Sequence, residues 1–392
     1  MGLSSGEHDH ARHRTVPRGR DDRVAQAPRH RATGTGTRAG LIALTLAFWA
    51  AGCAAETLRV ATFGAALSRD GPGLLLRDID RGDTQARAAA QVVAAAAPDI
   101  LLLTDFDYDY EGRALEAFAQ MVAEAGHPLP HRFARRPNAG MATGLDLDGD
   151  GRRGEAEDAQ GWGRFAGDGG MAILSRHPID AAASRDFSDL PWAELPDSLA
   201  PGADLSAEAL DAQRLSSNGH WAVTLRPEGA APITLLVFDA TPPVFDGPED
   251  RNGRRNADEI RFWRLFLDGA FGSPPGDRFV LLGNANLDPV DGEGRHDAIR
   301  ALLADPRLQD PRPMSGGGRA AANPEHRGDP ALDTADWDDP VPGNLRVDYV
   351  LPSADWRVTG AGVVWPEAGP LRAAVEAAGR HRLVWADIAP EG

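Results

Sequence analysis

The stretch Arg278–Gly292, which reads RFVLLGNANLDPVDG, constrains the fold of this chain more than any other. Its apolar run, Phe279–Leu282, is too short for a helix and has no polar alternation, so it predicts a strand buried on both faces. This strand ends at Gly283 and then presents two small polar side chains, Asn284 and Asn286. A rigid strand that delivers polar groups where it surfaces is a common basis for an active site. An ordinary strand-end turn is the alternative, because Asn and Gly are also turn residues.

Other short apolar runs in the chain follow the same pattern, and each ends at or next to a polar residue. They are Leu58–Phe63, Ile100–Thr104, Ile233–Phe238, Arg346–Leu351 and Leu383–Asp387. Helix-like segments, Thr84–Ala97 and Gly112–Ala125, lie between some of them. The pattern predicts an α+β fold of two packed β-sheets flanked by helices, a four-layer sandwich. Because no repeat is visible, residues 56–392 are expected to form one domain, acting as a monomer.

Residues 1–55 predict a disordered leader followed by an export signal. The first 40 residues are rich in Arg, His, Gly and Thr and lack apolar periodicity. The apolar run Leu41–Ala51 is too short to span a bilayer, and small residues follow it, as in an export signal. The only cysteine, Cys53, closes a run that resembles a bacterial lipobox. We therefore expect a periplasmic or extracellular protein, either lipid-anchored at Cys53 or soluble after cleavage following Ala55.

The charge of the chain restricts its substrates. It carries 58 acidic and 41 basic residues, a net charge of −17 at pH 7. An acidic surface repels a polyanion, and non-specific nucleic-acid binding depends on neutralising phosphates. Long nucleic acid is therefore a poor substrate for this chain, and a small phosphorylated molecule suits it better. Contact with a membrane is expected only through a lipid anchor.

An acidic segment in the loop-like region 137–170 matches the template of a calcium-binding loop. Oxygen-bearing side chains stand at places 1, 3, 5 and 12, which are Asp146, Asp148, Asp150 and Glu157. The sequence departs from a true EF-hand because no amphipathic helix flanks the loop. The segment is consistent either with an isolated Ca²⁺ loop or with a solvated acidic turn.

Five motifs at strand ends, taken in order, resemble those of the endonuclease/exonuclease/phosphatase superfamily. This is the fold of deoxyribonuclease I, sphingomyelinases and inositol-phosphate phosphatases. The motifs are Arg59–Gly64, Pro98–Asp105, Gly283–Asn286, Arg346–Tyr349 and Gly379–His381. The resemblance covers nearly all of the chain after the leader. It implies metal-assisted hydrolysis of a phosphate ester, in which a divalent ion polarises the phosphate and a His oriented by an Asp assists.

The resemblance also implies roles for particular residues. His381, its orienting partner Asp348, and Asn286 stand where the family has the same residue types. Asp105 replaces the Glu that holds Mg²⁺ or Mn²⁺, and it remains a hard oxygen ligand. Asp239 stands at the position of a mid-chain His.

Three further positions depart from the family pattern in a way that removes function. Asn284 replaces an Asp and cannot act as a base, and Arg380 replaces another Asp. Gly64 replaces an Asn. Arg380 could grip a substrate phosphate, and so could Arg254 in the Arg-rich polar loop of residues 246–256, although a solvated loop is the alternative for Arg254.

These departures leave three interpretations of function. The first is a metal-dependent phosphoesterase whose catalytic apparatus is impaired. The second is a catalytically inactive family member that acts as a binding module at the cell envelope. The third is a calcium-stabilised adhesion or scaffold domain that uses the acidic loop.

Overall fold

The computed structural model describes residues 57–391. The expected leader, the export signal and Cys53 lie outside the described residues. Within residues 57–391, no helix combines the length and the apolar character that a bilayer-spanning segment needs.

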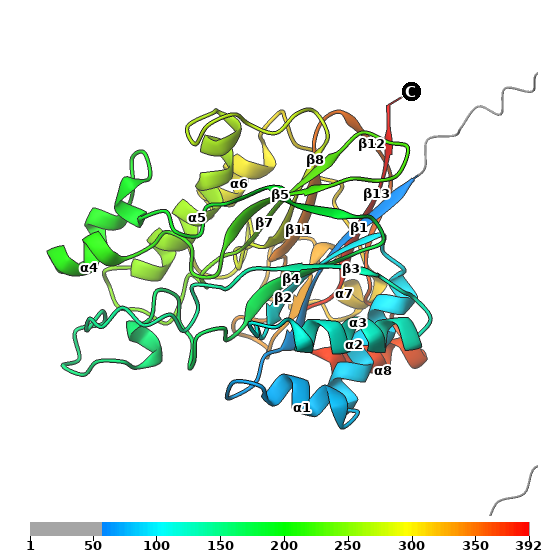
Figure 1. Cartoon of the computed structure of the whole chain (residues 1–392), viewed down its shortest axis with the longest axis horizontal. Helices are drawn as coiled ribbons and strands as arrows, with labels where there is room; N and C mark the ends of the chain where they lie inside the picture. The colour runs from blue at the N-terminus through cyan, green and yellow to red at the C-terminus, as the bar shows by residue number, and fades with distance from the viewer. Residues whose placement is uncertain (1–56, 392) are drawn as a thin grey trace, which may run out of the picture. The chain divides into compact units, whose positions relative to one another are not determined.

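Two β-sheets form the centre of the domain (Figure 1). The first sheet has six strands in the order β12-β13-β1-β2-β4-β3. Its strands are β1 (Leu58–Leu67), β2 (Ile100–Phe106), β3 (His131–Ala134), β4 (Gly170–Ser175), β12 (Trp356–Val363) and β13 (Val384–Pro390). The second sheet has five strands in the order β11-β8-β7-β6-β5. Its strands are β5 (Ile179–Asp186), β6 (His220–Leu225), β7 (Ile233–Asp239), β8 (Phe279–Asn284) and β11 (Asp348–Pro352).

Helices cover the outer face of each sheet. Buried residues of α2 (Thr84–Ala96), α3 (Arg113–Glu124) and α8 (Pro370–Ala378) belong to the core that contains the first sheet. Buried residues of α5 (Arg251–Leu267) and α6 (Asp297–Leu303) pack on the second sheet. The α+β sandwich of two sheets flanked by helices is therefore confirmed.

The remaining elements of the described chain are short. They are α1 (Leu74–Asp80), α4 (Ala207–Ala212), α7 (Gly316–Ala320), the paired strands β9 (Ala335–Asp336) and β10 (Asn344–Leu345), and 3-10 turns at Ala156–Asp158, Trp192–Glu194, Ala200–Gly202 and Pro330–Leu332.

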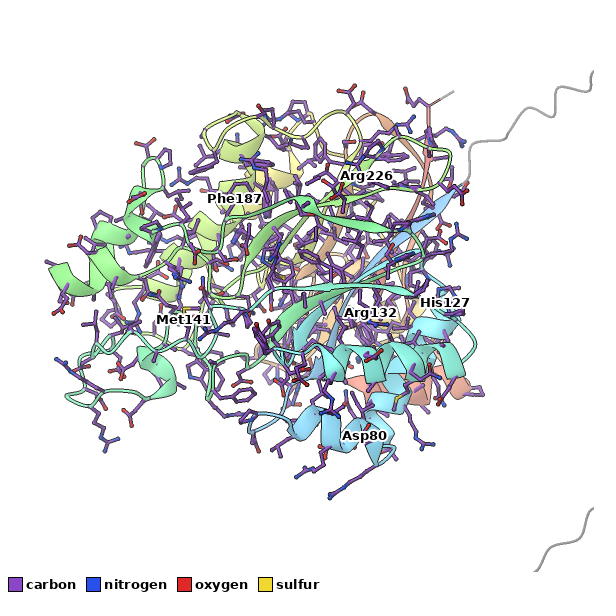
Figure 2. The ribbon with its side chains drawn as sticks, viewed as in Figure 1. Asp80, His127, Arg132, Met141, Phe187 and Arg226 are labelled. Carbon is purple, nitrogen blue, oxygen red and sulfur yellow. The ribbon has the colours of Figure 1, made fainter. Side chains whose placement is uncertain are left out.

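The central strands β7 and β8 of the second sheet carry apolar residues on both faces because they contribute to two cores. In β8, Val280 and Leu282 pack between the two sheets, whereas Phe279 and Leu281 pack beneath α5 and α6. This explains why the run has no polar alternation. Beside the edge strand β5, Phe187 (labelled in Figure 2) packs its ring against aromatic side chains of α5, with 5.2 Å between the ring centroids of Phe187 and Phe262 and an angle of 56° between the rings.

The register of the strands places polar residues from separate strands beside one another. In the parallel pair β7–β8, Asp239 is the partner of Asn284. In the antiparallel pair β8–β11, Asn284 is also the partner of Asp348. Asp239, Asn284 and Asp348 therefore form one row across three adjacent strands. In the first sheet, the parallel pair β1–β2 brings Gly64 next to Thr104.

Candidate functional site

A cleft of about 620 Å³ lies at the end of the two sheets. Residues from β1, β2, β7, β8 and the segment before β13 line it. Among them are the predicted site residues Asp105, Asp239, Asn284, Asn286 and His381. A second cavity, of about 660 Å³, lies between α5 and α6 and contains none of the predicted residues. The chemistry expected from the sequence therefore belongs to the first cavity.

His381 is held by a carboxylate behind it. Its Nδ1 lies 2.8 Å from Oδ2 of Asp348, which is fully buried. A carboxylate can only accept here, so Nδ1 carries the proton and Nε2 is left for the cleft. The Thr334 hydroxyl donates to the same Oδ2 at 3.0 Å and accepts the backbone N–H groups of Val347 and Asp348. The chain Thr334–Asp348–His381 therefore fixes the ring.

The carboxylates around His381 favour its charged form. Burial, the largest effect, lowers the pKa of His381, but Asp348, Asp239 and Asp105 together outweigh it. The net result is a pKa raised above the ordinary value of a histidine. An imidazolium at this position can stabilise negative charge that develops on a phosphate.

Gly64 makes room for the histidine ring. A Cβ at Gly64 would lie 2.9 Å from Cγ of His381, closer than real Cβ contacts. The Asn that the family resemblance places here would therefore meet the ring. The position of the His381 ring therefore depends on the absence of a side chain at residue 64.

We predict that Gly64→Ala destabilises the fold and displaces His381. Overpacking of a buried site lowers the free energy of unfolding by about 1–3 kcal/mol, which urea denaturation measures. Gly276→Ala is the matched control, because a Cβ there has no atom within 4 Å. A Gly64→Ala variant as stable as the wild type would contradict this packing.

Amide groups hold both oxygens of Asp239. Asn284 Nδ2 donates to Oδ1 at 3.1 Å, and Asn218 Nδ2 donates to Oδ2 at 2.8 Å. The other end of the Asn284 amide, Oδ1, accepts the backbone N–H of Asn286 at 2.8 Å. Asn286 in turn donates its Nδ2 to the carbonyl of Ala240 at 2.8 Å, which leaves its amide oxygen toward the cleft it lines.

Burial and neighbouring charge act together on Asp239. Burial raises its pKa well above the usual range, and Asp105 raises it further, while His381 and the hydrogen bond from Asn284 lower it. A carboxyl group in this condition binds a proton or a cation more readily than an ordinary one.

Two further carboxylates lie near Asp105. Asp105 has a positive φ of 55° at a break in the β2–β4 register. Asp168, which sequence reasoning missed, also lines the cleft, and its backbone precedes the glycines that lead into β4. Asp107 lies buried beside them. Burial, opposed by hydrogen bonds from Gly169 and Arg69, raises the pKa of Asp107 to about 7, with Asp168 and Asp105 contributing.

The cleft carries oxygen donors of the kind that a hard divalent cation binds, although among the described residues only Asp146, Asp148 and Asp158 bring three such oxygens within 4.8 Å of one another. Asp105, Asp168 and Asp239 supply carboxylate oxygens, and Asn286 supplies an amide oxygen. Oxygen donors of this kind suit Mg²⁺ and Mn²⁺. Burial raises the pKa values of Asp168 and Asp239, and the charge of Asp105 raises both further; a bound cation would relieve this repulsion.

The two arginines expected to grip phosphate do not line the cleft. Arg380 is half exposed and pairs with Asp338 at 3.3 Å. Arg254 donates its Nε to the carbonyl of Glu249 at 2.9 Å and covers the backbone of Gly202. Arg251 and Arg255 of the same helix line the cleft instead. They are four residues apart and share one face of α5, whereas Arg254 points elsewhere.

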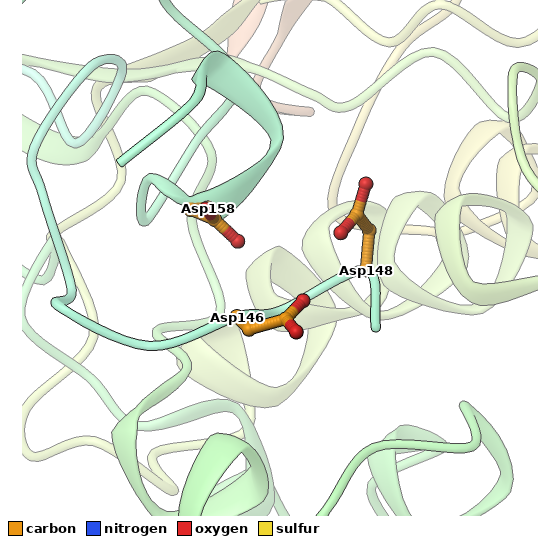
Figure 3. A group of neighbouring side chains, drawn as sticks. All are labelled: Asp146, Asp148 and Asp158. Carbon is orange, nitrogen blue, oxygen red and sulfur yellow. The ribbon is translucent and has the colours of Figure 1, made fainter. Parts of the chain in front are cut away.

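The acidic loop gathers three carboxylates, although not the four that the template predicts. Ligand oxygens of Asp146, Asp148 and Asp158 lie within 4.8 Å of one another (Figure 3). Asp150 is not in this group. Glu157 accepts a hydrogen bond from Trp162 at 3.2 Å and lines the cleft. The 3-10 turn Ala156–Asp158 directs successive side chains to different sides, so Asp158 takes the place expected for Glu157.

Comparison with known proteins then identifies the family. The model of the Endonuclease/Exonuclease/phosphatase family matches residues 66–381. The chain belongs to this family. Membership indicates metal-dependent phosphoesterase activity, which agrees with the oxygen donors and the histidine of the cleft. No curated protein sequence matches the chain.

Solved structures of the endonuclease/exonuclease/phosphatase fold are similar to this one. A family member from Beutenbergia cavernae is 18% identical, with 86% of this chain and 72% of that chain covered and a TM-score of 0.53. Sphingomyelinase C from Streptomyces griseocarneus is 17% identical, with 85% and 99% covered and a TM-score of 0.46. The catalytic domain of human Nocturnin is 12% identical, with 86% and 95% covered and a TM-score of 0.46.

Proposed function

We propose that this protein is an exported, metal-dependent phosphoesterase that hydrolyses a small phosphate ester or phosphodiester. The observation that carries the proposal is the pairing of His381 with buried Asp348 on the same cleft as Asp105 and Asp239. A histidine in a fixed orientation beside a set of oxygen donors is the minimum needed to bind a phosphate and stabilise its developing charge. The leader supports export, since its sequence resembles an export signal.

Each residue of the cleft has a defined part in this proposal. Asp105, Asp168 and Asp239 would hold Mg²⁺ or Mn²⁺, and the ion would polarise the phosphate when bound. His381 donates from Nε2 to a phosphate oxygen, and Asp348 keeps it charged and oriented. In the net reaction, the oxygen of water bonds to phosphorus and the bond from phosphorus to the alcohol breaks. The alcohol leaves with a proton that the water supplied.

A metal-dependence assay tests this proposal. The purified chain is incubated with bis(p-nitrophenyl) phosphate and Mg²⁺ or Mn²⁺, with a chelator in the control. Turnover that requires the ion is the expected result. The complete absence of metal-dependent turnover toward this and other small phosphate esters would overturn the proposal.

A catalytically inactive binding module is the second candidate, and Asn284 favours it. Both ends of its amide are occupied by structural hydrogen bonds, to Asp239 and to the backbone of Asn286. An amide at this position cannot take a proton from water. Retained affinity for inorganic phosphate without turnover would distinguish this module from the enzyme.

We also propose that the acidic loop binds Ca²⁺ through Asp146, Asp148 and Asp158. Saturating Ca²⁺ is expected to raise Tm by several degrees, because a ligand at about 100 times its Kd stabilises a fold by about 2.7 kcal/mol. Asp148→Ala should abolish the shift. Asp150→Ala, at a neighbouring exposed carboxylate outside the group, should retain it. Calcium stabilisation without any hydrolysis would favour the scaffold interpretation, and equal shifts in both variants would contradict the assigned ligands.

A further inference from the structure

Exposed aromatic side chains are concentrated at the mouth of the cleft. Of all the aromatic residues that the structure describes, three have strongly exposed side chains: Tyr110, Trp162 and Phe245. Two of them, Trp162 and Phe245, line the cleft, and they are 56% and 91% exposed. An exposed apolar surface beside a polar site marks a place where a ligand is bound.

The backbone on either side of Trp162 holds this residue firmly in place. A Cβ at Gly161 would lie 1.9 Å from the carbonyl oxygen of Ser217, and one at Gly163 would lie 2.5 Å from the nitrogen of Gly140. Only glycine fits at both positions, so the sequence Gly-Trp-Gly is wedged between neighbouring backbones. The Trp162 indole N–H is also bonded to Glu157 at 3.2 Å. The ring is therefore presented in a fixed position while much of its surface stays in water.

The backbone at Phe245 is also held in place, in a strained conformation. Its φ of 67° lies in the left-handed region, which a bulky side chain rarely adopts. The residues on either side of it are both tied to Asn252, whose Nδ2 donates to the carbonyl of Val244 at 2.7 Å and whose backbone N–H is bonded to the Asp246 carboxylate. A strained residue that holds an apolar ring in solvent gains nothing for the fold, and such strain is typical of binding sites.

Arg251 provides a positive charge on the wall of the same cleft. It is the first residue of α5, and its Nη1 donates to the carbonyl of Leu147 at 2.6 Å. This single bond leaves the other N–H groups of the guanidinium for an anion, and a guanidinium suits the oxygens of a phosphate. Arg164, which also lines the cleft, is paired with Asp70 at 2.6 Å.

We propose that the cleft recognises a small, soluble phosphate ester of an apolar alcohol, aromatic or alkyl. Arg251 contacts the phosphate, and Trp162 and Phe245 contact the alcohol. This inference rests on the proposed function, because it names the substrate class of that same site. The acidic balance of the chain, 58 acidic against 41 basic residues, disfavours a polyanion such as a nucleic acid.

Binding of two non-hydrolysable probes tests the substrate class without requiring turnover. Phenylphosphonate and methylphosphonate carry the same anion and differ only in the apolar group. Isothermal titration of the full chain in the presence of Mg²⁺ is expected to show at least a tenfold preference for phenylphosphonate. The double variant Trp162→Ala/Phe245→Ala should lose this preference and bind methylphosphonate within twofold of the wild type. Arg251→Gln should weaken the binding of both probes.

Controls separate recognition from folding and from catalysis. Tyr110→Ala removes an equally exposed aromatic ring that does not line the cleft, and its preference should equal that of the wild type. Equal wild-type affinity for the two probes would overturn the inference, even if phosphate esters are hydrolysed. A preference for phenylphosphonate without any turnover would refute the proposed function and leave the recognition intact. A third outcome concerns membranes. If the wild type shows no preference between the probes but binds phosphatidylcholine vesicles, and the double variant loses that vesicle binding, the aromatic pair contacts membranes and the inference is overturned.

Discussion

Replacing His381 with alanine is expected to lower kcat/KM for bis(p-nitrophenyl) phosphate by about 10²–10⁴-fold, the range of a lost general acid or base. The geometry supports an effect of this size because a fully buried carboxylate fixes the position of His381, with 2.8 Å between Nδ1 and Asp348 Oδ2. Arg380→Ala removes the exposed neighbour that pairs with Asp338, and it should leave kcat/KM within about twofold.

The pH profile of Asp348→Asn separates a chemical role of His381 from a structural one. Asp348 is the main group that raises the pKa of His381 against the opposing effect of burial. Removing its charge lowers that pKa, so activity that depends on the imidazolium should decline at a lower pH than in the wild type. A His381→Ala variant that keeps wild-type activity, or an Asp348→Asn variant with an unchanged profile, would contradict the assignment.

The arrangement of strands could be predicted from the sequence because buried strands leave a direct signature. Phe279–Leu282 has no polar residue, and the structure shows why: its alternate side chains enter two different cores. The sequence could also predict that polar residues at strand ends meet at one cleft. Once the strands are neighbours, register alone brings Asp239, Asn284 and Asp348 into one row.

The side chains whose positions the sequence does not predict lie in irregular segments or at the start of a helix. Arg254 belongs to an Arg-rich run that enters helix α5 after Asp250, which makes no side-chain cap hydrogen bond, and the phase of that helix decides which arginines reach the cleft. Glu157 stands at the twelfth place of the calcium-loop template, but the 3-10 turn at Ala156–Asp158 places the carboxylate of Asp158, one residue later, beside Asp146 and Asp148. Asp168 lies in a glycine-rich loop, where spacing has no fixed relation to direction. The positions of Glu157 and Asp168 depend on turn and loop geometry that periodicity does not encode, and the position of Arg254 depends on where its helix begins.

Exchanging Asp239 and Asn284 tests whether Asp239 on β7 replaces the carboxylate that the family motif has on β8. The family motif has its carboxylate on β8, where this chain has Asn284. The structure places a buried carboxylate, Asp239, directly beside that position on β7, with 3.1 Å between Asn284 Nδ2 and Asp239 Oδ1. A carboxyl group is therefore still present in the cleft, one strand away. Asp239→Asn removes it, and kcat/KM should fall by about 10²-fold or more.

Asn284→Asp alone should also be harmful, for a different reason. It removes the donor to Asp239 and places two carboxyl groups side by side. Such a pair either repels or shares one proton, and its pKa is raised. Because the folded state then binds a proton more tightly than the unfolded state, the variant should lose stability as pH rises. Urea denaturation at pH 5.5 and pH 8.5 measures this difference.

The double variant Asp239→Asn/Asn284→Asp should recover much of what either single change loses. The amide introduced at position 239 can donate to the carboxylate introduced at 284 and still accept from Asn218. That carboxylate can still accept the backbone N–H of Asn286. Every hydrogen bond of the row is thus restored with the charge returned to β8. A double-mutant cycle should give a favourable coupling of about 1–3 kcal/mol in both stability and activation free energy. If the two losses simply add, Asp239 does not replace the missing carboxylate, and the departure at Asn284 reflects a loss of catalysis instead.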